Sequence, residues 1–173
     1  MPRRDSTPTE REEYSRNPTV FGRILDGSLG ATGVSETDSL FAFRDISPAA
    51  EHHFLIIPKK RYRHVGELRP SELGLLQDMV EYARQLASCQ GIADFAAARA
   101  DGSVSLGFHT WPFISIYHLH LHLIFPAPVT KSCIKRLKFP KGGAPWYVSP
   151  ERAAVQFCDA PEGVNMLPAA VSP

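Results

Sequence analysis

The sequence predicts an α+β fold, in which an antiparallel sheet of about five strands packs against one long helix. Short apolar runs bounded by turn residues outnumber the helical segments, and a single long stretch repeats its apolar residues at helical spacing. The links between the runs are mostly short, which favours antiparallel neighbours over crossover connections. With 173 residues, of which 43% are hydrophobic and 21% charged, the chain fits one globular domain.

We expect that domain to span residues 19–158, between two tails. Residues 1–18 are rich in charges and prolines, with Tyr14 set among them, and we expect a disordered N-terminal tail because such a segment buries little apolar surface. Residues 159–173 carry scattered prolines and no apolar period, so we expect a loose C-terminal tail.

The first two strands are predicted at residues 40–43 and 54–57, which are short apolar runs. Asp45, Ser47 and Pro48 lie between the runs and are typical turn residues. A hairpin is the simplest geometry for this part of the chain.

The long helix is predicted from Pro70 to Gly91, with polar residues on its other face. Its apolar residues recur at steps of three and four and are interpreted as core: Leu73, Leu76, Met79, Val80, Ala83, Leu86 and Ala87. Residues 96–102 are small and polar, and we expect a loop there. Strands are predicted at residues 104–108 and 116–125.

The last of these strands carries the most informative pattern, a strict alternation of histidine and leucine over residues 118–123. Side chains alternate between the two faces of a strand, so the leucines point into a core while His118, His120 and His122 share the opposite face. Three histidines buried for structural reasons alone would need three sets of hydrogen-bond partners. The pattern therefore favours a functional site.

Two chemistries compete for this site. A metal site is plausible because imidazole is a common metal ligand, but His118 and His122 would lie about 13 Å apart on a strand that rises ~3.3 Å per residue. A further ligand would then have to come from His53, His64 or His109. Nucleophilic catalysis uses all three residues of the strand, one as the attacking imidazole and its neighbours as orienting and charge-stabilising groups. The spacing favours catalysis.

Composition excludes several other classes. Lys and Arg total 19 and Asp and Glu total 18, so the net charge of +1 argues against bulk binding of nucleic acid or of an anionic membrane. The three cysteines form no CxxC pair, and neither a disulfide framework nor a Cys-based zinc site is expected. No membrane-spanning run or targeting segment is expected, so the predicted location is the cytoplasm, together with the nucleus.

The run from His118 to Ile124 matches in full the signature of the histidine triad (HIT) superfamily, in which three histidines alternate with apolar residues. Residues 19–24, 41–48 and 53–60 are similar to the Hint branch of nucleoside phosphoramidases, and the resemblance covers about residues 19–150. Within that branch, residues 106–113 and 146–148 most resemble the Hint3 type of adenosine 5'-monophosphoramidase. The resemblance implies a HIT-like fold with a short N-terminal helix besides the long one.

The resemblance also implies residue roles. His120 resembles the nucleophile that takes the nucleoside monophosphate as a covalent phosphoramidate, and His122 resembles the donor to the phosphate oxygens. His118 and His53 resemble the orienting histidines, and Ser115 the hydroxyl that contacts the phosphate or leaving group. Asp45 resembles the carboxylate that accepts the ribose hydroxyls. The apolar clamp around the purine is matched by Phe21, Ile24, Phe43, Ile46 and Leu55, for each of which an ordinary core role is an alternative.

The sequence departs from the Hint pattern at two places. Gly107 stands where an Asn is usual, eleven residues before His118, and His109 follows it, so the loop at residues 108–116 is rebuilt. Some relatives carry a CxxC zinc pair where this chain has Thr19 and Gly22, and zinc is not expected here because neither residue is a good ligand.

The leading hypothesis is a hydrolase that cleaves the P–N bond of adenosine 5'-phosphoramidates through a His120-AMP intermediate, releasing AMP and an amine, with no metal and no cofactor. Alternatives are a dinucleoside polyphosphate hydrolase, an aprataxin-like enzyme that removes AMP from nucleic acid ends, and a nucleotide- or metal-binding module without activity. The expected partners are purine nucleoside monophosphate derivatives such as AMP and a second copy of the chain in a homodimer, with no membrane partner.

Overall fold

Six antiparallel strands form one sheet in the order β1-β2-β3-β5-β4-β6 in the computed structural model, which describes residues 8–127, 132–140, 142–162 and 166. The strands are β1 (Gly33–Glu36), β2 (Leu40–Arg44), β3 (His52–Pro58), β4 (Ser105–His109), β5 (Leu121–Phe125) and β6 (Tyr147–Val148). The helices are α1 (Pro8–Ser15), α2 (Val20–Leu25), α3 (Leu73–Cys89), α4 (Phe95–Ala100), α5 (Cys133–Lys138) and α6 (Pro150–Cys158), with short 3₁₀ turns at Val65–Glu67 and Pro70–Glu72.

The predicted α+β class is confirmed, and so are the hairpin of β2 with β3 and the single long helix. The sheet has six strands where about five were expected. The two outermost strands, β1 and β6, have only four and two residues and are too short to show a strand period, so hydrophobic pattern alone does not reveal them.

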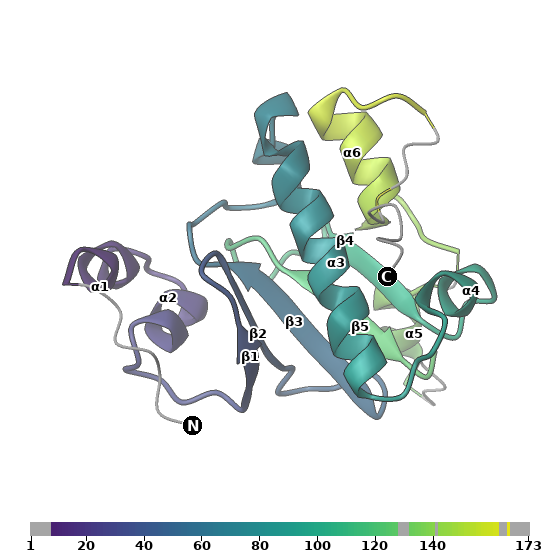
Figure 1. The fold of residues 1–173 in the computed structure, drawn as a ribbon, viewed down its shortest axis with the longest axis horizontal. Coiled ribbons are helices and arrows are strands. Elements are labelled where there is room, and N and C mark those ends of the chain that lie inside the picture. The colour runs from purple at the N-terminus through teal and green to yellow at the C-terminus, as the bar shows by residue number, and fades with distance from the viewer. Residues whose placement is uncertain (1–7, 128–131, 141, 163–165, 167–173) are drawn as a thin grey trace, which may run out of the picture.

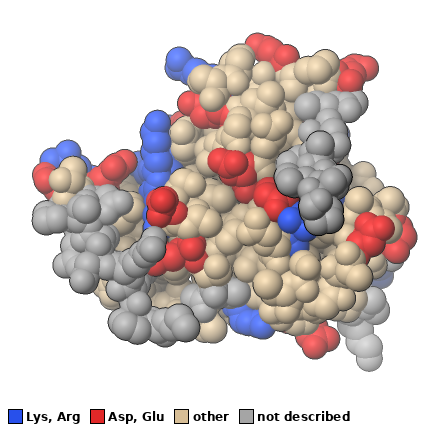
Figure 2. All heavy atoms as spheres, viewed as in Figure 1, with Lys and Arg blue, Asp and Glu red and all other residues tan. Residues whose placement is uncertain are grey.

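The main core lies between α3 and one face of the sheet (Figure 1). Alternate residues of the central strands, such as Phe54 and Ile56 of β3 and Leu123 of β5, pack there with Leu76 and Met79 of α3. Helix α6 completes this layer with Ala153, Ala154 and Cys158. Acidic and basic side chains are scattered over the outer surface of this layer (Figure 2), in keeping with the near-zero net charge.

The opposite face of the sheet carries two smaller apolar clusters. One gathers Tyr14 and the buried side of α2 against β2 and β3, and the other gathers Ala49, Ile124, Phe139 and Tyr147. Because side chains alternate along a strand, the residues of β3 and β5 that face this side are His53, Leu55 and Ile57, then His122 and Ile124. The histidines therefore lie between the two clusters.

Two predictions for the middle of the chain are wrong. The expected loop at residues 96–102 contains α4, whose alanine-rich sequence favours helix and whose start is capped by Asp94, which accepts from the backbone N–H of Ala97. The expected strand at 116–125 begins only at Leu121. The backbone N–H of Leu119 donates to the carbonyl of Tyr62 (2.6 Å), which lies in a loop, so this part of the backbone does not continue the ladder of β5.

The N-terminal segment also differs from the expected disordered tail over its described part. Residues 8–15 form α1, Tyr14 packs into the cluster with Phe21 and Ile24, and Asn17 is only 6% exposed. Residues 1–7 lie outside the described residues. Most of the expected C-terminal tail also lies outside the described residues. Met166, which is described, is buried.

The short N-terminal helix that the resemblance implies is α2, whose first turn is capped by Thr19 accepting from the N–H of Gly22. None of the helices within the described ranges combines the length and the apolarity needed to cross a membrane.

Candidate active site

Five buried imidazoles gather on the face of the sheet that α3 does not cover. His53 comes from β3, His109 from the end of β4 and His122 from β5, while His118 and His120 lie just before β5. Gly107 and Leu55 are the residues opposite His122 on its two neighbouring strands, so His109 and His53, each two residues along, flank it on the same face. The ring centroids of His109 and His53 lie 4.5 Å and 5.2 Å from that of His122.

The first hydrogen-bond chain runs through His53 and fixes the proton of His122. The backbone N–H of Ala49 donates to Nδ1 of His53 (3.1 Å), so a neutral His53 carries its proton on Nε2. That Nε2–H donates to Nδ1 of His122 (2.9 Å). His122 must then carry its own proton on Nε2, an atom that is buried and has no partner among the described residues. This N–H is a free donor inside the site.

The second chain fixes the proton of His120. Nδ1 of His120 lies 2.7 Å from the backbone carbonyl of His118, which can only accept, so the proton is on Nδ1. Nε2 of His120 therefore keeps its lone pair. The ring centroids of His120 and His122 are 4.9 Å apart, which places a lone pair and a free donor side by side. A nucleophile and a group that binds developing negative charge need this combination.

Burial keeps these imidazoles neutral. It lowers the pKa of His53, His109 and His118 to about 4. Burial also lowers the pKa of His120, and that of His122 well below its ordinary value. At neutral pH His120 is thus an unprotonated imidazole, which is the state that a histidine nucleophile requires.

His109 is a member of this cluster that the nucleophile hypothesis did not use. Its Nε2–H donates to the backbone carbonyl of Lys138 (3.0 Å), which leaves Nδ1 as an acceptor. The sequence did hold a signal for it. Ser105, Gly107 and His109 alternate on β4 and share one face, and β4 pairs with the strand that carries His122.

The ring of Tyr147 accounts for a glycine at position 107. A Cβ on Gly107 would lie 2.8 Å from Cζ of the Tyr147 ring, so the ring occupies the space that a side chain at 107 would need. The Tyr147 hydroxyl is hydrogen-bonded to Oγ of Ser105 (3.1 Å). Phe139 contacts the rings of His109, His122 and Tyr147, and completes an apolar wall on this side of the cluster.

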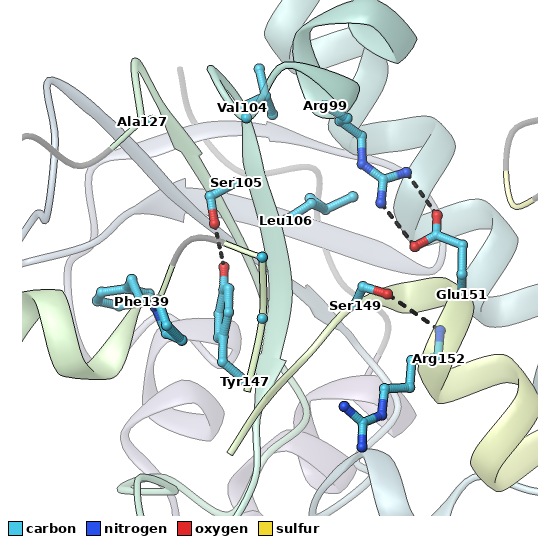
Figure 3. Close-up of a pocket in the computed structure, with 14 residues that line it drawn as sticks. Arg99, Val104, Ser105, Leu106, Ala127, Phe139, Tyr147, Ser149, Glu151 and Arg152 are labelled. Carbon is cyan, nitrogen blue, oxygen red and sulfur yellow. Dashed lines mark hydrogen bonds and ion pairs between the residues drawn. The ribbon is translucent and has the colours of Figure 1, made fainter. Parts of the chain in front are cut away.

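Phe139 and Tyr147 also line a surface hollow of about 350 Å³ (Figure 3). Its rim holds the bidentate ion pair of Arg99 with Glu151, at 2.7 and 2.9 Å, and the side chain of Arg152. The triad histidines do not line it. We therefore place the candidate active site at the imidazoles and not in this hollow.

Of the other predicted site residues, Asp45 lies beside the imidazoles, whereas Ser115 lies at a hollow that the triad histidines do not line. Asp45 follows β2; its Oδ1 accepts from the N–H of Ser47 (2.7 Å) and its Oδ2 lies 3.5 Å from Nε2 of His53. Ser115 is exposed in the loop before His118 and lines a second hollow, of about 590 Å³, with Arg61 and Arg63.

Four of the five residues of the predicted purine clamp are buried, and one is exposed. Phe21, Ile24, Phe43 and Leu55 are buried together in the cluster under α2, and the ring of Phe21 meets those of His118 and His120 edge-on. Ile46 is fully exposed, at 101% of its reference surface. The first four are therefore core residues whatever else they contact, and Ile46 is free to meet a ligand.

Two groups of side chains have metal-binding geometry within the described residues. One ring nitrogen each from His109, His120 and His122 lie within 4.8 Å of one another, and Asp45, His53 and His122 form a second such group. From the sequence, one metal ion bound by His118, His120 and His122 together was disfavoured by their span of about 13 Å, and a further ligand was expected from His53, His64 or His109. The fold supplies His109 from β4, so imidazole ligands for a transition metal are present.

Comparison with known proteins defines the class of this site. Residues 18–138 match the family model described as "Scavenger mRNA decapping enzyme C-term binding". The zebrafish protein named Adenosine 5'-monophosphoramidase HINT3 is 32% identical over 135 residues, which cover 77% of this chain and 78% of that protein. The mouse protein of the same name is 33% identical, over 70% of this chain and 72% of that protein. The crystal structure of a HIT family hydrolase from Legionella pneumophila matches with a TM-score of 0.56 and 32% identity, covering 65% of this chain and 96% of that one.

The chain therefore belongs to the family of that model and to the histidine triad superfamily, as the motif at residues 118–124 predicted. It is a hydrolase of that superfamily, and among the curated relatives it is similar to the HINT3 type.

Proposed function

We propose that this hydrolase cleaves the P–N bond of adenosine 5'-phosphoramidates, releasing AMP and an amine. Three relatives at 32–37% identity carry the name Adenosine 5'-monophosphoramidase. The observation that carries the mechanism is the hydrogen bond from Nδ1 of His120 to the carbonyl of His118. It leaves Nε2 as a neutral nucleophile beside the Nε2–H of His122, which has no partner in the described part of the chain.

In the proposed reaction, Nε2 of His120 attacks phosphorus, the P–N bond of the substrate breaks, and the amine leaves with a proton supplied by solvent, which the later attack of water on phosphorus returns to solvent. The Nε2–H of His122 donates to a phosphoryl oxygen, and His53 holds His122 in the tautomer that can do so. Water then attacks phosphorus and breaks the bond to His120, which releases AMP and returns the imidazole to its neutral form.

We assign substrate contacts to the remaining predicted residues. Asp45 binds the ribose hydroxyls, and Ser115 contacts the phosphate or the leaving amine. Ile46 covers the purine, beside the apolar cluster that holds Phe21.

The test is turnover of an AMP-lysine conjugate by the whole chain and by His120→Ala. The variant should lose several orders of magnitude in kcat and still bind AMP. Rapid quenching should trap AMP on the wild-type protein through an acid-labile, base-stable bond, and not on the variant. His52→Ala is the matched control, because His52 lies next to His53 on β3 but stacks on Phe125. It should keep its turnover.

The metal-dependent alternative is decided in the same assay. A histidine nucleophile needs an unmetallated Nε2, so turnover should survive exhaustive chelation. Added Zn²⁺ should inhibit, since the imidazoles of His109, His120 and His122 would bind it. Activity that is lost with chelator and restored by Zn²⁺, without a trapped adduct, would overturn the mechanism.

A further inference from the structure

We infer that Asn17, from the segment before α2, is a positioning residue of the active site: its amide holds the ring and the tautomer of His118, which in turn holds His120. Its effect on turnover rests on the proposed function, whereas its effect on His118 does not. Asn17 is separated from His118 by 101 positions in the sequence, and both side chains are buried.

The orientation of the Asn17 amide is fixed by Thr19. Oδ1 of Asn17 accepts from the backbone N–H of Thr19 (3.1 Å) and from its hydroxyl (2.8 Å). A backbone N–H can only donate, so this atom of the amide is the oxygen. The NH₂ group must then face Nδ1 of His118, which lies 2.8 Å away.

Both nitrogens of His118 are committed by this arrangement. Nδ1 accepts from Asn17, and Nε2–H donates to the backbone carbonyl of Pro58 (2.8 Å). The ring is wholly buried, and a second proton would place an N–H against the NH₂ group of Asn17. Arg61 and His120 are the other groups that act electrostatically on this ring, and each disfavours a second charge there. Asn17 therefore holds His118 in a single neutral form.

The consequence reaches the nucleophile through the backbone of His118. Its carbonyl is the acceptor that fixes Nδ1–H of His120, so a displaced His118 would release the ring whose Nε2 attacks phosphorus. Phe21, in α2, packs edge-on against the rings of His118 and His120.

Helix α2 is shaped to admit Asn17. A Cβ on Gly22 would lie 2.4 Å from the backbone oxygen of Asn17 and 2.7 Å from its Cβ, so the close approach requires glycine at this position. This contact is independent of the hydrogen bonds to Thr19 and His118. The close packing on Gly22 and the hydrogen bonds to Thr19 and His118 together enclose the buried amide of Asn17.

The first test is the tautomer of His118, read by ¹⁵N NMR of histidine-labelled protein. The wild type should show His118 protonated on Nε2 alone. In Asn17→Ala the Nδ1 partner is lost, and the signals should shift or broaden as other forms are populated. In Asn17→Asp, which has nearly the same size, a carboxylate should draw a second proton onto His118 at neutral pH. An unchanged His118 spectrum in both variants would overturn the inference, and the use of two variants guards against one that folds poorly.

The second test separates positioning from folding. Asn17→Ala should lower kcat about ten- to a hundredfold with little change in KM for AMP-lysine, and should add nothing in a His118→Ala background, since both act through the same ring. Arg16→Ala, which removes an exposed ion pair with Glu12, is the control and should leave kcat unchanged. Additive losses in the double variant would show a merely structural role. A wild type without turnover would refute the proposed function and leave the NMR result to decide on Asn17.

Discussion

Asp45 is shared between a turn and the histidine cluster, which shapes how its proposed role can be tested. One carboxylate oxygen accepts from the N–H of Ser47 and the other lies 3.5 Å from His53, with the side chain 17% exposed. A replacement that removes the whole carboxylate would therefore disturb the turn as well as any ligand. Asparagine keeps an acceptor for Ser47 while removing the charge.

We expect Asp45→Asn and Asp45→Ala to raise KM for ribonucleotide phosphoramidates, by about ten- to a hundredfold, because a hydrogen bond to a charged group is worth about 1.5–3 kcal/mol. For 2'-deoxy substrates the effect should be smaller, since one of the two hydroxyls is missing. Steady-state kinetics on both sugars measure this. An equal increase of KM for both sugars would show that Asp45 holds the turn or His53 and does not bind the ribose.

At the scale of residues, the sequence revealed those that a local pattern or a motif carries. His118, His120 and His122 form a short alternating motif, and their gathering with His53 follows from strand pairing. Asn17 could not be predicted, because its partner lies 101 positions away and its surroundings have the composition of a tail. A single amide gives no periodic signal.

At the scale of elements, the junction of β4 with β6 explains why position 107 is a glycine. Phe108 pairs with Val148, and the ring of Tyr147 lies directly over Gly107. Strand β6 has only two residues, and this packing and the hydrogen bond of Tyr147 to Ser105 add to its short pairing with β4.

Gly107→Ala should therefore destabilise the fold by about 1–3 kcal/mol, because the new Cβ meets a rigid aromatic ring and overpacks a closed site. Denaturant unfolding of Gly107→Ala, Tyr147→Leu and the double variant measures the coupling. The double variant should lose less than the sum of the two single variants, as the clash is then relieved. Strict additivity would show that the ring does not restrict position 107.

Helices and strands could be predicted where their apolar residues recur at a single helical or strand spacing. Helix α3 and the hairpin of β2 and β3 follow from their apolar spacing alone. The stretch at residues 116–120 has the alternation of a strand, yet Leu119 bonds to Tyr62 and His120 to its neighbour His118. Tertiary hydrogen bonds decided the conformation there, and they are invisible to a pattern of period two.

At the scale of the molecule, the main hydrophobic core and the candidate active site lie on opposite faces of the sheet. One face is packed by α3 and α6, and the other holds the imidazoles between two apolar clusters. Pairing of β4 with β6 is confined to residues 108 and 109, so Ser105 and Leu106 border the hollow of Figure 3. The homodimer stays a prediction, and this incompletely paired edge of β4 is where we expect a second copy to meet the first.

The cluster of neutral imidazoles also ties the stability of the whole fold to pH. The pKa values of His53, His109 and His118 fall from 6.5 to about 4 on burial, so the unfolded chain binds their protons first as the pH drops. The free energy of unfolding should therefore be highest above about pH 6.5 and decline as the pH falls from there towards 4. Each such imidazole should contribute a loss on the order of 2 kcal/mol by pH 5, because one pKa unit corresponds to about 1.4 kcal/mol.

Thermal melts at pH 8, 6.5 and 5 measure this decline, in a range above the one where ordinary carboxylates titrate. His109→Gln is the matched variant, since a glutamine amide can still donate to the carbonyl of Lys138 but cannot take up a proton in this range. Its melting temperature should fall less steeply between pH 6.5 and pH 5 than that of the wild type. A wild-type melting temperature that stays constant down to pH 5 would mean that the imidazoles are not buried as neutral groups. The tautomers assigned to His53, His120 and His122, and the nucleophile that depends on them, would then fail together.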